Sequence, residues 1–187
     1  MQMSEGFVSN ISMIGSWYDF MPKLQTGTVL DTATLYIRCG ISTLALGAKR
    51  VFYYHGYGDS PRYGESSYAN GYGFLEGDGV PTPMMAAYAV MTNQLEDKKY
   101  VQSGKVGSVW YHVFQGADGI VAVAWSDFGV KSKVALPLQV LGATNFMGNA
   151  APFQNSGTSA TIALDRTPVY LKLKALPAKK LAVKVVP

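Results

Sequence analysis

The order of segments between residues 50 and 95 places the strongest constraint on the fold of this chain. Residues 51–54 (Val-Phe-Tyr-Tyr) form a β-branched and aromatic run without alternation, typical of a strand covered on both faces of a parallel sheet. Residues 56–73 are a loop rich in Gly, Tyr, Ser and Pro, and residues 76–79 (Glu-Gly-Asp-Gly) are a turn signal. Thr82 and Pro83 then favour the start of a helix. Strand, loop and helix in this order predict one βα unit of a parallel α/β barrel, whose chemistry lies in the loops after its strands.

A second helix is predicted before that strand. Asp31 and Thr32 offer N-caps, and Gly47 offers a C-terminal stop. Between these signals, apolar residues recur at helical spacing: Ala33, Ile37, Ile41, Leu44 and Ala48. A complete eight-fold barrel needs roughly 200 residues or more. Only about the first half of this chain has a helical pattern, so we expect most of such a barrel to be missing.

The pattern changes near residue 98, beyond which no helical periodicity is present. Short strand candidates follow, separated by Gly, Asp, Asn and Pro turns: 107–115, 120–126, 133–138, 158–164 and 167–173. Residues 115–119 (Gln-Gly-Ala-Asp-Gly) predict a hairpin turn, and we expect the tail from Pro177 to fray. Together they predict a small antiparallel β-sandwich. The fold class is therefore α/β plus all-β: residues 1–97 as the last two βα units of an incomplete TIM-type barrel, and residues 98–187 as an accessory sandwich.

The composition indicates the general class of protein but does not identify its function. An apolar fraction of 48% with 15% charged residues indicates a packed chain. The net charge of +4 includes a lysine cluster at residues 172–184, which we interpret as a solvated face and tail because no nucleic-acid motif accompanies it. No apolar run approaches the roughly 20 residues that span a bilayer. The first residues do not resemble a signal peptide, which leaves the localisation open. Cys39 is the single cysteine, and His55 and His112 are too far apart in sequence to predict a metal site.

Three stretches carry a resemblance to a known family. They are residues 3–6 (Met-Ser-Glu-Gly), residues 48–55 with 73–83, and residues 145–149 with 167–171. In this order they resemble the C-terminal end of retaining glycoside hydrolases of clan A. The first stretch resembles the end of the seventh barrel strand. The second resembles the eighth strand, its loop and the start of the last helix, and the third resembles late strands of the β-sandwich that often follows such barrels.

The resemblance implies a catalytic role for Glu5, at the position where those enzymes hold a nucleophilic glutamate. A retaining glycosidase needs two carboxyl groups about 5–5.5 Å apart, one as nucleophile and one as acid/base. In this clan the acid/base comes from the fourth strand, which precedes Met1, so we expect the isolated chain to be inactive. The alternative for Glu5 is an exposed, solvated side chain with no role in catalysis.

The same resemblance assigns substrate contacts to aromatic residues beside these strands. Trp17 and Tyr18 follow the first strand, while Tyr54, His55 and Tyr57 stand at the carboxyl end of the next. Aromatic faces there would stack on sugar rings. Many clan A enzymes have a tryptophan near this point, so the tyrosines and histidine leave the sugar open. Alternatively, Tyr54 packs in the core and Tyr57 covers a loop.

The leading hypothesis is a C-terminal fragment of a retaining glycoside hydrolase that cleaves O-glycosidic bonds of oligo- or polysaccharides by double displacement. It needs the missing N-terminal barrel half as a partner and uses no cofactor or metal. A second hypothesis is a stand-alone carbohydrate-binding sandwich that uses Trp110, Tyr111 and Trp125. Against it, Trp110 and Trp125 lie in alternating strands and suit a core equally well. A third hypothesis is a vestigial structural protein.

Overall fold

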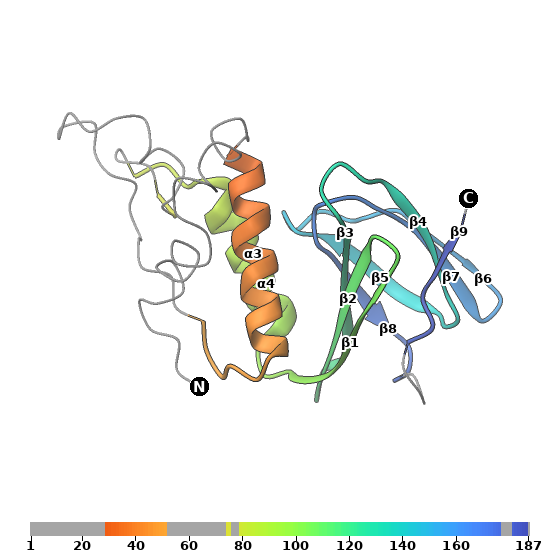
Figure 1. The fold of residues 1–187 in the computed structure, drawn as a ribbon. Helices are drawn as coiled ribbons and strands as arrows, with labels where there is room; N and C mark the ends of the chain where they lie inside the picture. Colours follow the sequence, from red (N-terminus) through yellow and green to blue (C-terminus); the bar gives the residue numbers. More distant parts are fainter. Residues whose placement is uncertain (1–28, 52–73, 76–78, 177–180, 187) are drawn as a thin grey trace. The chain divides into compact units, whose positions relative to one another are not determined.

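The computed structural model describes residues 29–51, 74–75, 79–176 and 181–186. The chain divides into two compact units, Met1–Ala89 and Val90–Pro187. The helices are α3 (Val29–Ala45) and α4 (Pro83–Leu95). The strands are β1 (Lys99–Val106), β2 (Val109–Gly116), β3 (Gly119–Ser126), β4 (Ser132–Leu136), β5 (Val140–Asn145), β6 (Phe153–Ser156), β7 (Ser159–Leu164), β8 (Val169–Leu173) and β9 (Lys184–Val186), shown in Figure 1.

Helix α3 confirms the amphipathic pattern. Ala33, Ile37 and Ile41 are fully buried on one face. The helix begins two residues before Asp31, so Asp31 lies in the first turn and not at the predicted N-cap position. A negative charge in the first turn interacts favourably with the helix dipole. At the other end Gly47 takes a φ of 95°, a conformation that glycine adopts without steric cost, and the helix stops.

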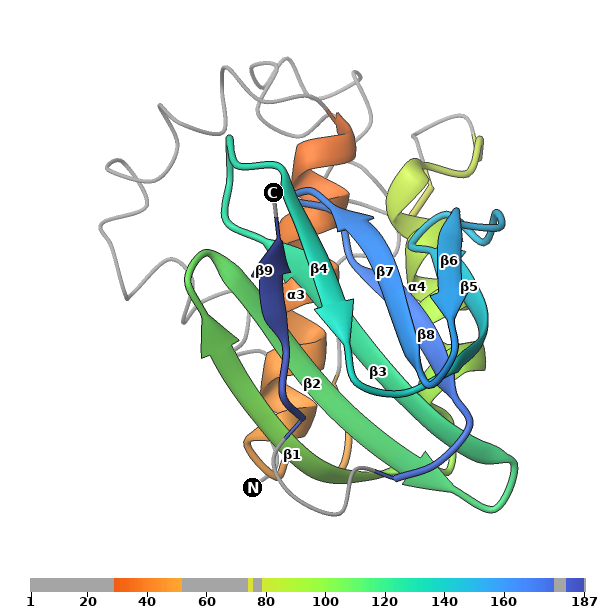
Figure 2. The ribbon, with the colours of Figure 1, turned by 90° about the vertical axis from the view of Figure 1, so that its right-hand side faces the viewer.

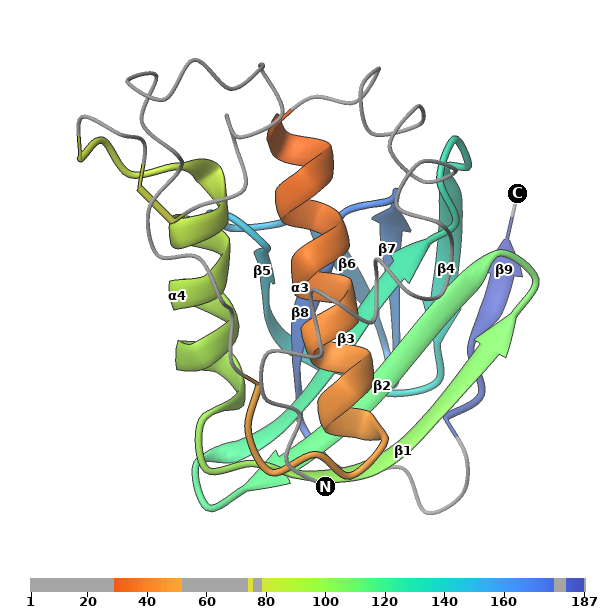
Figure 3. The ribbon, with the colours of Figure 1, turned by 60° about the vertical axis from the view of Figure 1, so that its left-hand side comes forward.

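Helix α4 begins at Pro83 as predicted (Figure 3). The Thr82 hydroxyl donates to the carbonyl oxygen of Phe74 at 3.2 Å, and the Phe74 ring lies 5.0 Å from that of Tyr88. Of the strand predicted at residues 51–54, only Val51 is described, because residues 52–73 lie outside the described part of the chain. The barrel portion therefore stays a prediction. Neither helix, within the part described, is long and apolar enough to cross a membrane.

The second unit contains two antiparallel sheets that face each other (Figure 2). One sheet has the strand order β1-β2-β3-β8-β5, and the other has the order β6-β7-β4-β9. The five predicted strands correspond to β2, β3, β4, β7 and β8. The predicted hairpin is confirmed, since Gly116 pairs with Gly119 at the turn between β2 and β3. A sheet-rich antiparallel domain thus follows the helices.

Four strands, β1, β5, β6 and β9, were not predicted, and each lacks a clear alternating pattern. Irregular register interrupts β1 after Tyr100 and β5 after Val140. Strand β6 is largely exposed. Strand β9 lies in the tail expected to fray, yet Val186 pairs with Lys133 of β4. Long-range pairing stabilises these segments, which local sequence does not mark.

Apolar side chains from both sheets fill the space between them. Alternate residues of the central strands point inwards, as a two-residue period requires. The buried set includes Val109, Tyr111, Val113, Ala122, Ala124, Val134, Leu136, Ile162, Leu164 and Leu171. The residues between them in β2, β3 and β8 lie on the opposite, outer face of the five-stranded sheet.

Gly104 of β1 is predicted to tolerate no side chain, because it pairs directly with Tyr111 of β2. A Cβ atom at Gly104 would lie 2.5 Å from the Tyr111 hydroxyl oxygen and 2.6 Å from Cζ. The Tyr111 ring is buried and cannot move aside without cost. We expect Gly104→Ala to lower the free energy of unfolding by about 1–3 kcal/mol in urea denaturation.

Gly142→Ala is the matched control for that measurement. Gly142 also lies in the five-stranded sheet, but a Cβ atom there meets nothing within 4 Å. Its effect should stay within about 0.5 kcal/mol. Equal losses in the two variants would show that the contact with Tyr111 is not the cause.

Candidate functional site

The residues predicted to act on substrate all lie outside the described part of the chain. They are Glu5, Trp17, Tyr18, Tyr54, His55 and Tyr57. Their roles as nucleophile and sugar contacts remain predictions. The site geometry that follows concerns the second unit alone.

The three aromatic residues considered for a binding sandwich differ in their surroundings. Tyr111 is buried in the core between the sheets, and Trp125 is buried on the outer face of β3. Neither ring is available to a glycan at the surface, so this part of the binding hypothesis is wrong for both. Trp110 is 37% exposed and is the accessible one of the three.

A lysine and an aspartate hold the Trp110 ring. Its Nε1 donates to Oδ1 of Asp127 at 2.8 Å, and Nζ of Lys105 lies 4.5 Å from the ring centroid. Lys105 also forms an ion pair with Asp127 at 3.2 Å. The ammonium occupies one ring face in a cation–π contact. A sugar stacking on that face would have to displace Lys105.

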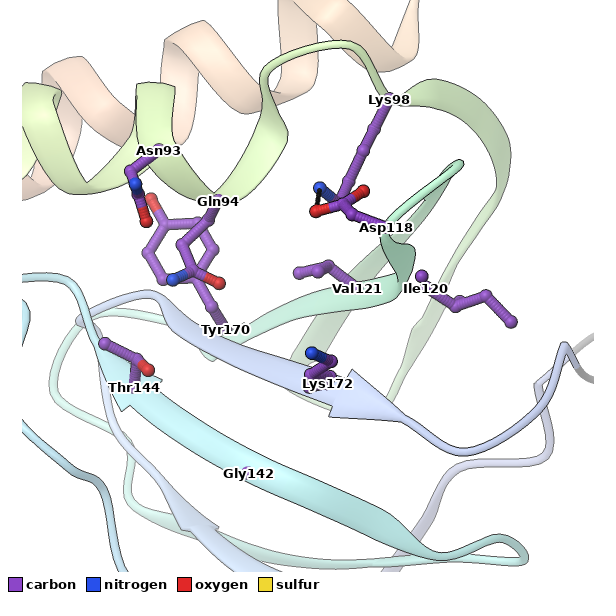
Figure 4. Close-up of a pocket in the computed structure, with 11 residues that line it drawn as sticks. Asn93, Gln94, Lys98, Asp118, Ile120, Val121, Gly142, Thr144, Tyr170 and Lys172 are labelled. Carbon is purple, nitrogen blue, oxygen red and sulfur yellow. Dashed lines mark hydrogen bonds and ion pairs between the residues drawn. The ribbon is translucent and has the colours of Figure 1, made fainter.

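A polar pocket of about 270 Å³ lies where the end of α4 meets the turn between β2 and β3 and strands β8 and β5 (Figure 4). Its polar side chains come from Asn93, Gln94, Lys98, Asp118, Thr144, Tyr170 and Lys172. The lining combines amides, hydroxyls and charges of both signs. Such a lining can donate and accept hydrogen bonds at several points.

An ion pair closes one end of this pocket. Nζ of Lys98 lies 2.6 Å from Oδ2 of Asp118; the Lys98 side chain is only 3% exposed, while that of Asp118 is 70% exposed. The hydrogen bond from Lys98 lowers the pKa of the Asp118 carboxyl, and the charge of Lys172 contributes in the same direction. Asp118 is therefore an anion at neutral pH, with free lone pairs towards solvent.

Tyr170 forms another part of the wall and is 1% exposed. Its hydroxyl has no hydrogen-bond partner among the described residues. Burial raises the pKa of the phenol, so the group stays neutral, able to donate and accept. Residues 167–173 were predicted as a strand, but no role was predicted for Tyr170. The alternating pattern of the strand could have indicated it. Val169 and Leu171 point to the core, so Tyr170 between them must point to the opposite face.

His112 lies on the same outer face, two strands away from Tyr170. His112 pairs with Val123, which pairs with Tyr170. Burial lowers the pKa of the imidazole to about 4, so His112 is neutral near pH 7. Neither ring nitrogen has a described partner, and its ring lies 5.1 Å from that of Trp125. No cluster of three potential metal ligands occurs in the ranges that the structure describes.

The described geometry can be compared with solved structures. The chain is similar to a family 39 glycoside hydrolase from the gut symbiont Bacteroides cellulosilyticus WH2, with a TM-score of 0.67 and 18% sequence identity. The match covers 81% of this chain and 32% of that chain, so this chain spans about a third of the length of the hydrolase. No protein family and no curated protein matches by sequence. The similarity shows a glycoside hydrolase-like fold.

Proposed function

We propose that this chain is the C-terminal part of a retaining glycoside hydrolase of clan A. The observation that carries the proposal is the structural match, because 81% of this chain aligns with about a third of a glycoside hydrolase. The order of sequence stretches supports it independently. On this proposal residues 1–97 complete a barrel whose other strands come from an N-terminal half, and residues 98–187 are the accessory sandwich.

The proposed reaction is double displacement at the anomeric carbon of an oligo- or polysaccharide. The Glu5 carboxylate attacks that carbon while an acid protonates the leaving oxygen; water then attacks the glycosyl-enzyme, and the same acid acts as base. Trp17, Tyr18, Tyr54, His55 and Tyr57 would hold the sugar rings. The acid/base must come from the N-terminal half, so the chain alone should not turn over substrate.

The proposal is tested by supplying the missing strands. The sequence encoded upstream of Met1 is co-expressed with this chain, and hydrolysis of a panel of aryl glycosides is measured. We expect activity only with both parts present. Glu5→Gln should then reduce kcat at least ~10³-fold, because the variant loses the covalent route.

Glu96→Gln is the control, since Glu96 is exposed and has no proposed role in the reaction. It should retain activity within about threefold, in the range of ordinary surface changes. Unchanged activity in Glu5→Gln would overturn the nucleophile assignment. Absence of hydrolysis in a well-folded complex, across the whole panel, would overturn the hydrolase proposal itself.

A further inference from the structure

We propose that the pocket beside Tyr170 binds one neutral, polyhydroxylated molecule of the size of a single sugar residue. The site lies entirely in the second unit and uses none of the residues proposed for catalysis. It therefore goes beyond the hydrolase proposal and does not depend on it.

The size of the pocket limits the ligand. Its volume of about 270 Å³ lies just below the roughly 300–1,000 Å³ of pockets that hold drug-sized molecules. The amides of Asn93 and Gln94 and the hydroxyl of Thr144 line it, and each can both donate and accept hydrogen bonds. Ligand hydroxyl groups also donate and accept, so a small polyol can pair with all three.

The Tyr170 hydroxyl is the second observation that points to a ligand. A buried hydroxyl without a partner costs folding free energy, which a ligand hydrogen bond would recover. The ring projects from β8 towards Asn93 and Gln94 in Figure 4. Asn93 is exposed, so we expect its side chain to rotate as the ligand reaches the phenol and then to pair with a ligand hydroxyl.

The charged side chains of the lining can bind the hydroxyl groups of a ligand. Asp118 is already paired with Lys98, and Lys172 lies close enough to lower the pKa of Asp118. A carboxylate and an ammonium side by side can bind neighbouring hydroxyls, one as acceptor and one as donor. Because Lys98 is paired with Asp118, the Lys172 ammonium is the charged donor left for a ligand hydroxyl.

The test is a titration of the whole chain with D-glucose, D-xylose and D-galactose, followed by amide chemical shifts in NMR. We expect saturable shifts at pocket residues with at least one of the three sugars. Tyr170→Phe should weaken that binding about three- to tenfold, the loss of one hydrogen bond. The free variant should be at least as stable as the parent chain, because it no longer buries an unpaired hydroxyl.

Thr144→Val supplies a second variant with a matched control. It should weaken sugar binding by a similar factor, whereas Thr161→Val should not, because Thr161 is equally half-buried but lies on the other sheet. The absence of saturable shifts with all three sugars would overturn the proposal, as would binding that neither Tyr170→Phe nor Thr144→Val weakens. Tighter binding of D-glucuronate than D-glucose, lost in Lys172→Gln, would show an anion site instead.

Discussion

Replacing Leu171 by alanine is expected to lower the free energy of unfolding by about 2–5 kcal/mol. Leu171 is 1% exposed and lies in the centre of β8, between Ala122 of β3 and Ala143 of β5. Its direct neighbours in both adjacent strands are small, so they cannot fill the space that a truncated side chain leaves. Urea denaturation at pH 7 measures the loss.

Leu141→Ala is the matched control for this cavity. Leu141 lies in the neighbouring strand β5 but is 57% exposed. The same truncation there should cost less than about 0.5 kcal/mol. Similar losses at Leu171 and Leu141 would contradict the position of the core between the two sheets.

His112 is expected to make the chain less stable as the pH falls from 7 to 5, by about 2 kcal/mol. In the unfolded chain the imidazole takes up a proton near pH 6.5. In the folded chain burial lowers its pKa to about 4, so the folded state stays neutral over most of this range. The unfolded state then binds more protons, so the stabilisation is complete above pH 6.5 and is lost between about pH 6.5 and 4.

The measurement is the free energy of unfolding at pH 7 and pH 5, in the parent chain and in His112→Phe. The variant should lose most of the difference, because phenylalanine fills the buried site without titrating. The chain has two histidines, so His55→Gln is the natural control and should keep the pH dependence if His112 is the cause. A loss of the dependence in His55→Gln would contradict the assignment to His112.

Local patterns in the sequence predicted both described helices and five of the nine described strands. The stripe at Ala33, Ile37 and Ile41 and the stop at Gly47 marked α3, because helical spacing and glycine geometry are properties of neighbouring residues. The turn at residues 116–119 marked the hairpin of β2 and β3 for the same reason. Strand β9 could not be predicted in this way, since its stability depends on pairing with β4, about fifty residues earlier in the chain.

The candidate sites, like the strands, were only partly predictable from the sequence. Glu5 and the aromatic residues around it came from a family resemblance, and the described residues do not include them. The alternating pattern of the strands could not show which of Trp110 and Trp125 is exposed. The structure shows that Trp110 is exposed and Trp125 is buried. The Tyr170 pocket could not be predicted from the sequence, because its residues come from separate segments and form no recognisable motif.

By itself, the sequence determined that helices precede residue 98 and that short strands follow it, because periodicity and turn residues act locally. Only the tertiary structure decided which polar groups meet. The pocket brings together polar side chains from four separate segments: Asn93, Gln94 and Lys98; Asp118; Thr144; and Tyr170 and Lys172. Their proximity depends on the order β3-β8-β5, in which β8 inserts between strands that precede it in sequence. That order follows from burying the apolar faces of both sheets together, a global condition that no short segment of the sequence encodes.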